Sequence, residues 1–147
     1  MEDAMNFERS MPFSREAEMS VLGAMFLDMQ CIPEAIDVVK ADDFYIDRHK
    51  ELFAAMNELY NLGKPIDIVT LKEQLTVRGS FEQVGGLPFI LEIANFVPTT
   101  RNIGHYAKIV AEKSILRKLI KVSDDISEKC YRGDEELENI IGTAEQA

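Results

Sequence analysis

The chain has 147 residues, of which 46% are hydrophobic and 29% are charged, so it can form one packed domain with at most an appended element. Its formal net charge of −10 at pH 7 argues against a surface that binds a phosphate backbone over its whole extent. No apolar run approaches the roughly 20 residues that span a bilayer, so we expect a cytoplasmic protein without a membrane partner.

The N-terminal part of the sequence predicts a flexible arm followed by a first helix. Residues 1–13 lack a periodic apolar pattern and contain Pro12 near their end. Ser14 is a suitable N-cap, and the apolar residues that follow recur at helical spacing: Ala17, Val21, Leu22, Met25 and Phe26. Pro33 then suits the first turn of a short helix that ends near Val39.

Two further helices are predicted between residues 47 and 78. The segment from Asp47 to Leu62 carries apolar residues on one helical face, and Gly63 stands where a left-handed C-terminal cap belongs. Thr70 and Glu73 predict a capping box for the next helix, which ends before Gly79. The β-branched run over residues 66–70 is too short to indicate a strand.

The glycine pair Gly85 and Gly86 predicts a turn between helices, because so short a glycine signal is more typical of a turn than of a phosphate-binding loop. Pro88 then opens a helix that Pro98 prevents from continuing. The apolar residues of this helix are Phe89, Ile90, Ile93 and Phe96. With the helices before it, this segment predicts a globular helical head over residues 14–99.

The last third of the chain predicts a helical hairpin over residues 100–147. No proline interrupts the pattern from about residue 100 to 131, which indicates one helix of about 45 Å. Gly133 ends this helix and Asp134 is expected to cap a second one, whose apolar stripe contains Leu137, Ile140, Ile141 and Ala144. We therefore predict an all-α fold, a compact multi-helix head followed by an antiparallel helical hairpin.

The sequence supplies no recognisable catalytic, cofactor-binding or metal-binding set. It contains no GxxxxGK[ST] loop, so a nucleotide-binding motor is not indicated. His49 and His105 have no partner at metal-binding spacing and are interpreted as histidines on helix surfaces. A small helical enzyme would need a convergent acid, base or nucleophile, which the sequence does not supply.

The carboxylates of the first predicted helix and the two cysteines do not indicate a catalytic or metal site. Glu16 and Glu18 are two residues apart and do not share a helical face, so capping and solvation explain them. Cys31 and Cys130 are far apart in sequence and lack CxxC spacing, which supports neither a zinc site nor a disulfide. They are interpreted as buried or idle thiols.

Charge is distributed unevenly in the predicted hairpin. Residues 101–121 contain six basic residues and one acidic residue, and residues 122–147 contain two basic and eight acidic residues. The first arm could pair electrostatically with the second arm or stay solvated. It could also bind nucleic acid, which makes a helical nucleic-acid-binding module the alternative function. Five of its six basic residues form the candidate cluster: Lys108, Lys113, Arg117, Lys118 and Lys121.

An apolar stripe on the first arm is the strongest indication of a protein partner. Because a protruding hairpin has no core on all sides, either the second arm covers this stripe or another protein does. The stripe contains Ile109, Leu116, Leu119, Ile120, Val122 and Ile126.

The ordered combination of several short segments resembles the N-terminal domain of bacterial replicative DNA helicases of the DnaB family. The resemblance extends from about Pro12 to Cys130. The segments are Glu16-Ala17-Glu18 with Ser20-Val21-Leu22-Gly23-Ala24, Asp43-Phe44-Tyr45 with His49, Gly63-Lys64-Pro65-Ile66-Asp67 with Val69-Thr70, Val84-Gly85-Gly86, Val97-Pro98-Thr99, Asn102-Ile103 with Tyr106-Ala107, and Ile109-Val110-Ala111-Glu112-Lys113 with Leu116-Arg117 and Leu119-Ile120.

This resemblance implies a non-catalytic assembly and docking domain. Family members pair their hairpins between subunits, as a dimer or as a trimer of dimers that forms a collar on a hexamer, and the collar binds the C-terminal domain of primase. A helicase loader is a further implied partner. We expect Ile109, Leu116 and Leu119 to contribute to subunit pairing, and Phe89, Ile120 and Ile126 to lie near the primase-docking surface.

The resemblance also implies that chemistry belongs elsewhere in a longer parent protein. The parent is expected to be an ATP-dependent 5'-3' DNA helicase whose RecA-like motor follows this domain after a linker. ATP, Mg²⁺ and most DNA contacts are expected in that motor, and no cofactor is expected in this chain.

Overall fold

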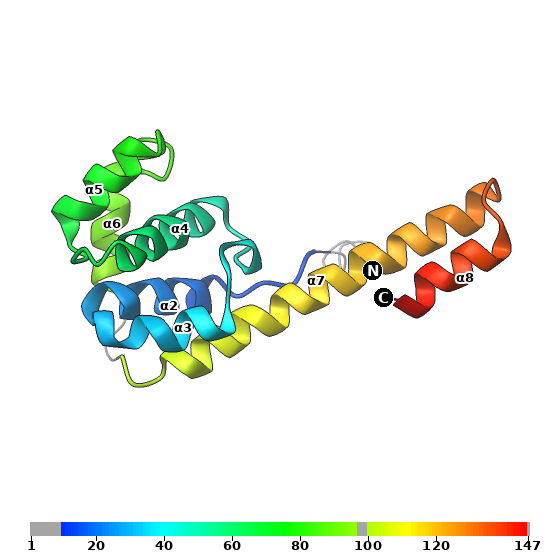
Figure 1. The fold of residues 1–147 in the computed structure, drawn as a ribbon, viewed down its shortest axis with the longest axis horizontal. Helices are drawn as coiled ribbons and strands as arrows, with labels where there is room; N and C mark the ends of the chain where they lie inside the picture. The colour runs from blue at the N-terminus through cyan, green and yellow to red at the C-terminus, as the bar shows by residue number, and fades with distance from the viewer. Residues whose placement is uncertain (1–9, 97–99, 147) are drawn as a thin grey trace, which may run out of the picture. The chain divides into compact units, whose positions relative to one another are not determined.

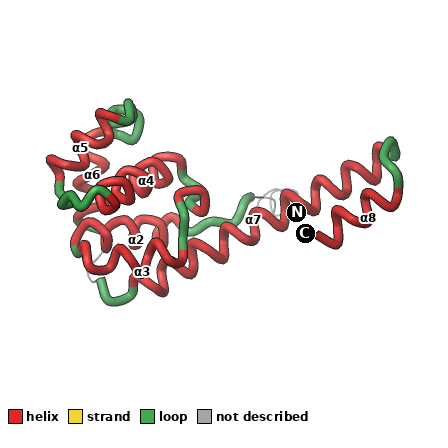
Figure 2. The backbone as a smooth tube through the Cα atoms, viewed as in Figure 1, coloured by secondary structure: helices red, strands yellow, loops and turns green. Residues whose placement is uncertain are grey.

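A computed structural model of the chain describes residues 10–96 and 100–146, and in this part every regular element is helical and no strand is present (Figure 2). The predicted all-α fold is therefore confirmed. The elements are α2 (Arg15–Leu27), the 3-10 turn η1 (Met29–Cys31), α3 (Ile32–Val38), the 3-10 turn η2 (Ala41–Asp43), α4 (Asp47–Asn61), α5 (Ile68–Val77), α6 (Gly86–Ala94), α7 (Ile103–Arg132) and α8 (Leu137–Gln146).

The described chain divides into two compact units, which we call the head unit and the hairpin unit. The head unit is Phe13–Glu112, and the hairpin unit contains Pro12 and the residues from Lys113 onward. The helix α7 is continuous and contributes its first turns to the head unit and its remainder to the hairpin unit (Figure 1). The predicted boundaries at residues 13 and 99 stay predictions, and the residues before Ser10 lie outside the described part.

Helix starts in the head unit follow local capping chemistry, with one predicted cap corrected. The Ser14 hydroxyl accepts a hydrogen bond from the Ala17 amide at 3.1 Å, which confirms the predicted N-cap of α2. The predicted capping box of Thr70 with Glu73 is wrong. Asp67 is the N-cap of α5, because its carboxylate accepts from the Thr70 amide and the Thr70 hydroxyl accepts from the Asp67 amide, both at 2.9 Å.

The turn into α6 needs glycine at two consecutive positions. Gly85 has a φ of 114° and Gly86 a φ of 64°, both in the left-handed range that side chains disfavour. The helix then runs from Gly86 to Ala94, so Phe96, predicted on its apolar face, lies beyond its end and is 37% exposed. Pro98, the predicted terminator, lies outside the described residues.

The core of the head unit forms where α2, α4 and α6 meet. Contacts join α2 to α4 and α6, and α4 also packs against α5 (Figure 1). The first turns of α7 contribute Ile103, Ala107 and Val110 to the same buried cluster. Its largest fully buried side chains include Leu22, Phe44, Phe53, Leu71 and Ile90. Burial of this apolar surface is the main stabilising contribution to the head.

The hairpin unit consists of most of α7 and the shorter α8, joined by a turn at Gly133, whose φ is 65° (Figure 1). The prediction that Asp134 caps the second helix is wrong, since α8 begins at Leu137 and Asp134 pairs with Arg132 at 3.9 Å. Of the predicted apolar stripe on α8, Ile140 is buried, whereas Leu137 is 70% and Ile141 47% exposed. A single isoleucine therefore makes most of the buried apolar contact of α8.

Candidate partner-docking surface

Three of the exposed apolar side chains of α7 in the hairpin unit line the same groove. Leu116 is 45%, Leu119 49% and Ile120 38% exposed. Their spacing of three and four residues places them on one face of the helix. Each side chain therefore belongs to one continuous apolar surface on the hairpin.

This surface borders a groove of about 390 Å³, which we call the α7 groove. Its lining residues all belong to the hairpin unit and are Pro12, Leu116, Leu119, Ile120, Ser123 and Asp124. The Arg117 guanidinium donates a hydrogen bond from Nη1 to the carbonyl oxygen of Pro12 at 2.9 Å, which holds one wall of the groove against α7. A groove with apolar walls and polar groups at its rim is typical of a protein-docking surface.

The six predicted partner residues are only partly brought together. Leu116, Leu119 and Ile120 line the α7 groove, although the first two were predicted for subunit pairing and the third for primase docking. Ile126 lies further along α7 and is half-buried. Leu116 and Leu119, predicted for subunit pairing, and Ile120, predicted for primase docking, therefore share one surface on the hairpin.

The remaining two predicted residues belong to the head unit. Ile109 is half-buried and packs against the core of that unit. Phe89 is only 3% exposed, and its ring stacks on His49 with 5.9 Å between the ring centroids. The guanidinium carbon of Arg48 lies 4.9 Å from the centroid of the same ring. Phe89 thus supplies packing and little exposed surface, and its predicted role in docking stays a prediction.

The basic segment of α7 is not a uniformly solvated cationic face. Arg117 is 7% exposed and engaged with Pro12, and Lys108 lies 4.0 Å from Glu112 one helical turn away. The ion pairs at the tip of the hairpin involve Lys129 and Arg132, which lie outside the predicted basic segment 101–121. Within the segment, the engagement of Arg117 with Pro12 and of Lys108 with Glu112 weighs against a continuous track for a phosphate backbone.

Glu18 and His49 belong to a buried hydrogen-bond network in the head unit, which we call the bracket. The interpretation of both residues as solvated surface residues is therefore wrong. Glu18 is 1% and His49 0% exposed, so neither is a surface residue. The Glu18 carboxylate accepts from His49 Nδ1 at 2.9 Å and from the backbone amides of Tyr45 at 2.9 Å and Ile46 at 3.3 Å. The bracket therefore joins α2 to the chain that enters α4. A buried carboxylate with three donors is a structural element rather than a solvated acid.

The spacing of apolar residues around Glu18 is a sequence signal for the burial of its carboxylate. Glu18 shares a helical face with Val21, Leu22 and Met25, at the spacing i, i+3, i+4 and i+7. A carboxylate in the middle of an apolar face must find a buried donor, so its burial could be expected. Its partner could not be identified, because His49 is 31 residues away in sequence.

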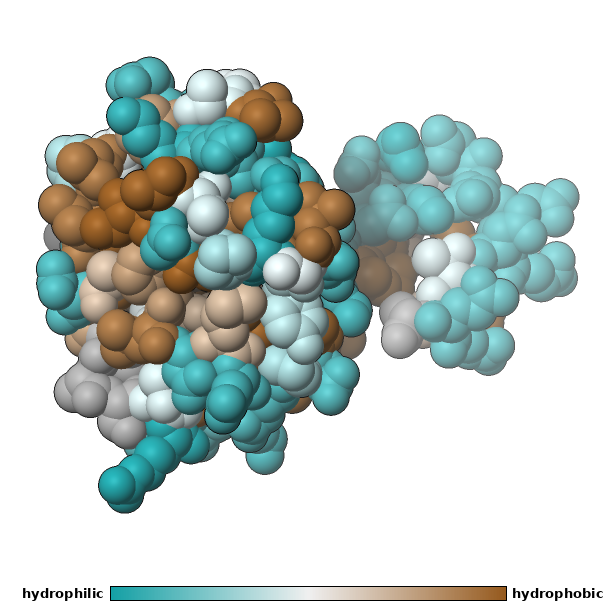
Figure 3. Space-filling model, turned by 60° about the vertical axis from the view of Figure 1, so that its left-hand side comes forward, coloured by the Kyte–Doolittle hydropathy of each residue, from teal (hydrophilic) through white to brown (hydrophobic). Residues whose placement is uncertain are grey.

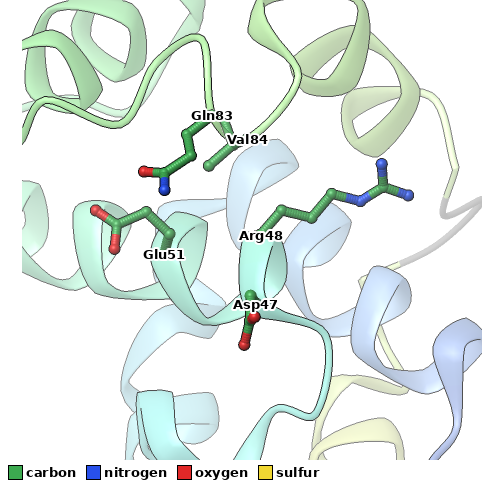
Figure 4. Close-up of a pocket in the computed structure, with 5 residues that line it drawn as sticks. All are labelled: Asp47, Arg48, Glu51, Gln83 and Val84. Carbon is green, nitrogen blue, oxygen red and sulfur yellow. The ribbon is translucent and has the colours of Figure 1, made fainter.

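The pocket drawn in Figure 4 does not form a reaction centre. Its lining residues are Asp47, Arg48, Glu51, Gln83 and Val84. The Glu51 carboxylate and the Gln83 amide lie on one side, whereas the Arg48 side chain extends away from them and Asp47 points in a third direction (Figure 4). Glu51 is engaged with Arg78 and Ser80, and the Arg78 guanidinium lowers the pKa of its carboxyl. The side chains do not converge on a common point where a substrate could react.

The described residues contain neither a metal-binding cluster nor a membrane-spanning helix. Between residues 10 and 96 and between 100 and 146, no three His, Cys, Asp or Glu side chains are grouped so as to hold a metal ion. In the same part of the chain, no helix combines the length and the apolarity needed to cross a membrane.

The two thiols are predicted to differ sharply in reactivity. Cys31 is buried and donates to the carbonyl oxygens of Asp28 at 2.9 Å and Ala24 at 3.2 Å, and burial raises its pKa to about 11. Cys130 is exposed. At pH 8 we expect one thiol per chain to react promptly with Ellman's reagent and the second to react only after unfolding. Prompt reaction of a Cys130→Ser variant would contradict this.

The raised pKa of Cys31 also has a consequence for stability. Because the thiol loses its proton more readily in the unfolded chain, its contribution to stability is present below pH 9 and declines as the pH rises toward 11.

Comparison with known proteins identifies close relatives of the chain. The family model "DnaB-like helicase N terminal domain" matches residues 10–112. The replicative DNA helicase DnaC of Bacillus subtilis (strain 168) is 42% identical over 146 residues, which are 99% of this chain and 32% of that protein. The chain thus spans about a third of the length of this curated relative.

Solved structures agree with the sequence comparison. The crystal structure of the N-terminal domain of DnaB helicase from Mycobacterium tuberculosis is 35% identical with a TM-score of 0.88, covering 93% of this chain and 97% of that one. The N-terminal domain of DnaB helicase from Helicobacter pylori, described with its interactions with primase, is 24% identical with a TM-score of 0.70. It covers 79% of this chain and 90% of its own, and this second likeness shows the fold alone.

Proposed function

The chain belongs to the DnaB-like helicase N-terminal domain family, and on that premise we propose that it is a non-catalytic assembly and partner-docking domain of a hexameric replicative DNA helicase used in DNA replication. In this role its hairpin pairs with the hairpin of another subunit to build a collar as a trimer of dimers. Pairing adds contact energy to the ring and thereby raises the stability of the assembled state.

The observation that carries the proposal is the exposed apolar face of α7. Leu116, Leu119 and Ile120 stay 38–49% exposed within the hairpin unit and border a groove. Apolar side chains left uncovered on a two-helix unit are stabilised by contact with another protein. The residues proposed for pairing are Leu116 and Leu119, together with Ile109, which lies earlier on the same helix and is half-buried against the core of the head unit.

The partner proposed for the docking role is the C-terminal domain of primase. The supports are the family membership, the apolar lining of the α7 groove, and the Helicobacter pylori relative, which interacts with primase. We place Ile120 and Ile126 at or near this contact, with Phe89 as a packed support in the head. Docking would hold primase at a high effective concentration near the replication fork.

The catalytic functions are proposed for the longer parent protein. ATP-dependent 5'-3' unwinding, the sites for ATP and Mg²⁺, and most contacts with DNA would belong to a motor domain beyond the stretch that this chain matches. A helicase loader is a further proposed partner, and the proposed location is the cytoplasm.

The test is a calorimetric titration of the chain with the C-terminal domain of its cognate primase, with masses measured by light scattering. We expect saturable heat with a defined stoichiometry, weakened at least tenfold by Ile120→Ala together with Ile126→Ala. If the double variant breaks self-association but leaves primase binding intact, Ile120 and Ile126 belong to subunit pairing and not to primase docking. If there is no heat at several temperatures and the mass of the mixture is unchanged, the docking proposal fails for this chain.

A further inference from the structure

An exposed apolar groove lies in the head unit, along the outer side of α5 and beside the first residues of α6. We call it the α5 groove, and its volume is about 550 Å³. Its apolar side chains are largely uncovered, since Val69 is 72%, Val77 76% and Leu87 43% exposed. Figure 3 turns the side with α5 and α6 toward the viewer, and hydrophobic residues gather there among hydrophilic ones. The lining residues are Ile68, Val69, Lys72, Glu73, Thr76, Val77 and Leu87.

The side chains that line this groove are not needed for the packing of α5 within its own unit. The inner face of the helix already buries Leu71 and Leu75 completely, and both belong to the core of the head. Val69 and Thr76 lie on the outer face, because they are one heptad apart on a helix of 3.6 residues per turn. A helix with a second apolar face turned to solvent is typical of a protein contact.

A second groove of about 300 Å³ adjoins the first near the end of α5. Thr76 lines both, so the two grooves form one surface. This surface follows α5 for about 15 Å, the length of a ten-residue helix at 1.5 Å per residue. It can therefore contact about three turns of a partner helix. The other lining residues of the second groove are Gly79, Phe81 and Glu82.

The charged side chains of the two grooves indicate which partner they suit. Lys72 is the cation among the described lining residues, and its Nζ lies 5.6 Å from the centroid of the Phe81 ring in a cation–π contact. The carboxylates of Glu73 and Glu82, in contrast, form no hydrogen bond or ion pair with any described residue. The surface is thus apolar along α5 and carries negative charge that the chain itself does not compensate.

We propose that the α5 groove binds a cationic amphipathic helix of another protein. Apolar side chains at positions i, i+3, i+4 and i+7 of that helix contact Val69, Val77 and Leu87, as in other helix-in-groove complexes. Lysine or arginine side chains on its flanks pair with Glu73 and Glu82. The formal net charge of −10 also accelerates the approach of a cationic partner.

The same charges disfavour the other possible occupants of the α5 groove. A second copy of the chain would bring its own net charge of −10 and the same two glutamates to the contact. Anionic membranes and nucleic acids would be repelled in the same way. The α5 groove belongs to the head unit and shares no described lining residue with the α7 groove, so this inference does not depend on hairpin pairing or on primase docking.

The test is an NMR titration of the isotope-labelled whole chain with a synthetic peptide of about 14 residues, roughly 21 Å long as a helix. Its leucines recur at i, i+3, i+4 and i+7, and lysines occupy the other positions. We expect saturable shifts of backbone amides that cluster on α5 and the start of α6. A peptide with glutamate in place of every lysine should bind at least tenfold more weakly. So should a peptide of the same composition whose order lacks helical periodicity.

Two variants separate the apolar from the electrostatic contribution to peptide binding. Val69→Thr together with Val77→Thr keeps the side-chain shape but brings hydroxyl groups into the contact, and should weaken binding about tenfold. Glu73→Gln together with Glu82→Gln should weaken binding about fivefold and reduce its dependence on salt. All four side chains are exposed, so the head should stay folded in both variants, which thermal melts can check.

Glu16→Gln together with Asp37→Asn is the matched control for the loss of two charges. Both carboxylates are exposed in the head unit away from the α5 groove, and peptide binding should change less than about twofold. An absence of saturable shifts, shifts confined to the α7 groove, or equal binding of the glutamate peptide would overturn the proposal.

Two further measurements decide between the possible occupants of the α5 groove. If the wild-type chain dimerises in sedimentation equilibrium and the two valine exchanges abolish the dimer, the occupant is a second copy and the proposal fails. If the same exchanges abolish binding to vesicles of phosphatidylcholine and phosphatidylglycerol, the occupant is a membrane and the proposal also fails. Failure of the primase titration alone would leave the α5 contact standing.

Discussion

Glu18→Gln is expected to lower the free energy of unfolding of the chain by about 2–4 kcal/mol, the range for a buried polar group that loses its partner. The Glu18 carboxylate accepts hydrogen bonds from three donors, the amides of Tyr45 and Ile46 and the Nδ1 of His49. An amide side chain offers one oxygen and turns an NH₂ group toward at least one of these donors. Urea denaturation followed by circular dichroism measures the loss.

Glu16→Gln is the matched control for this experiment. Glu16 is exposed, lies on the same helix two residues earlier, and undergoes the same chemical change. Only a helix-dipole effect of about 0.3–1 kcal/mol is expected there. If Glu18→Gln unfolds within 0.5 kcal/mol of the wild type, the bracket is not the stabilising element that its burial indicates.

Helix positions could be predicted from the sequence because their ends are encoded locally. Ser14 caps α2 and Gly63 follows α4 with a φ of 70°, as the pattern of residues indicated. The helix caps that were predicted wrongly also depend on local sequence, where two neighbouring residues can each act as the cap. At Asp67 and Thr70, two adjacent capping boxes were possible, and the carboxylate that stands one turn earlier forms the bonds.

Tertiary partners could not be predicted in the same way. The periodicity that marks Phe89 as apolar does not say whether it faces the core or a partner, and the structure buries it beside His49. The stripe on α7 has the opposite outcome, since Leu116 and Leu119 stay exposed. Which side of a helix is covered depends on elements distant in sequence, and in an assembling protein on other copies, so a single sequence leaves it open.

Leu119→Asp is expected to raise the dissociation constant of hairpin-mediated pairing at least a hundredfold, which corresponds to about 2.7 kcal/mol. The introduced carboxylate would have to lose its water on entering an apolar contact, and no cation lines the α7 groove to compensate it among the described residues. Because Leu119 is 49% exposed in the hairpin unit, the stability of the monomer should change little. Sedimentation equilibrium measures the association directly.

A control variant and a titration with the primase domain show whether the α7 groove serves subunit pairing, primase docking or both. Leu62→Asp makes the same exchange at a 62% exposed leucine in the head unit and should leave the mass unchanged. An unchanged dissociation constant for Leu119→Asp would remove the α7 groove from subunit pairing. Because Ile120 lines the same groove, the monomeric variant should also bind the primase domain more weakly. Full primase affinity in a chain that no longer pairs would mean that docking uses a surface separate from the α7 groove.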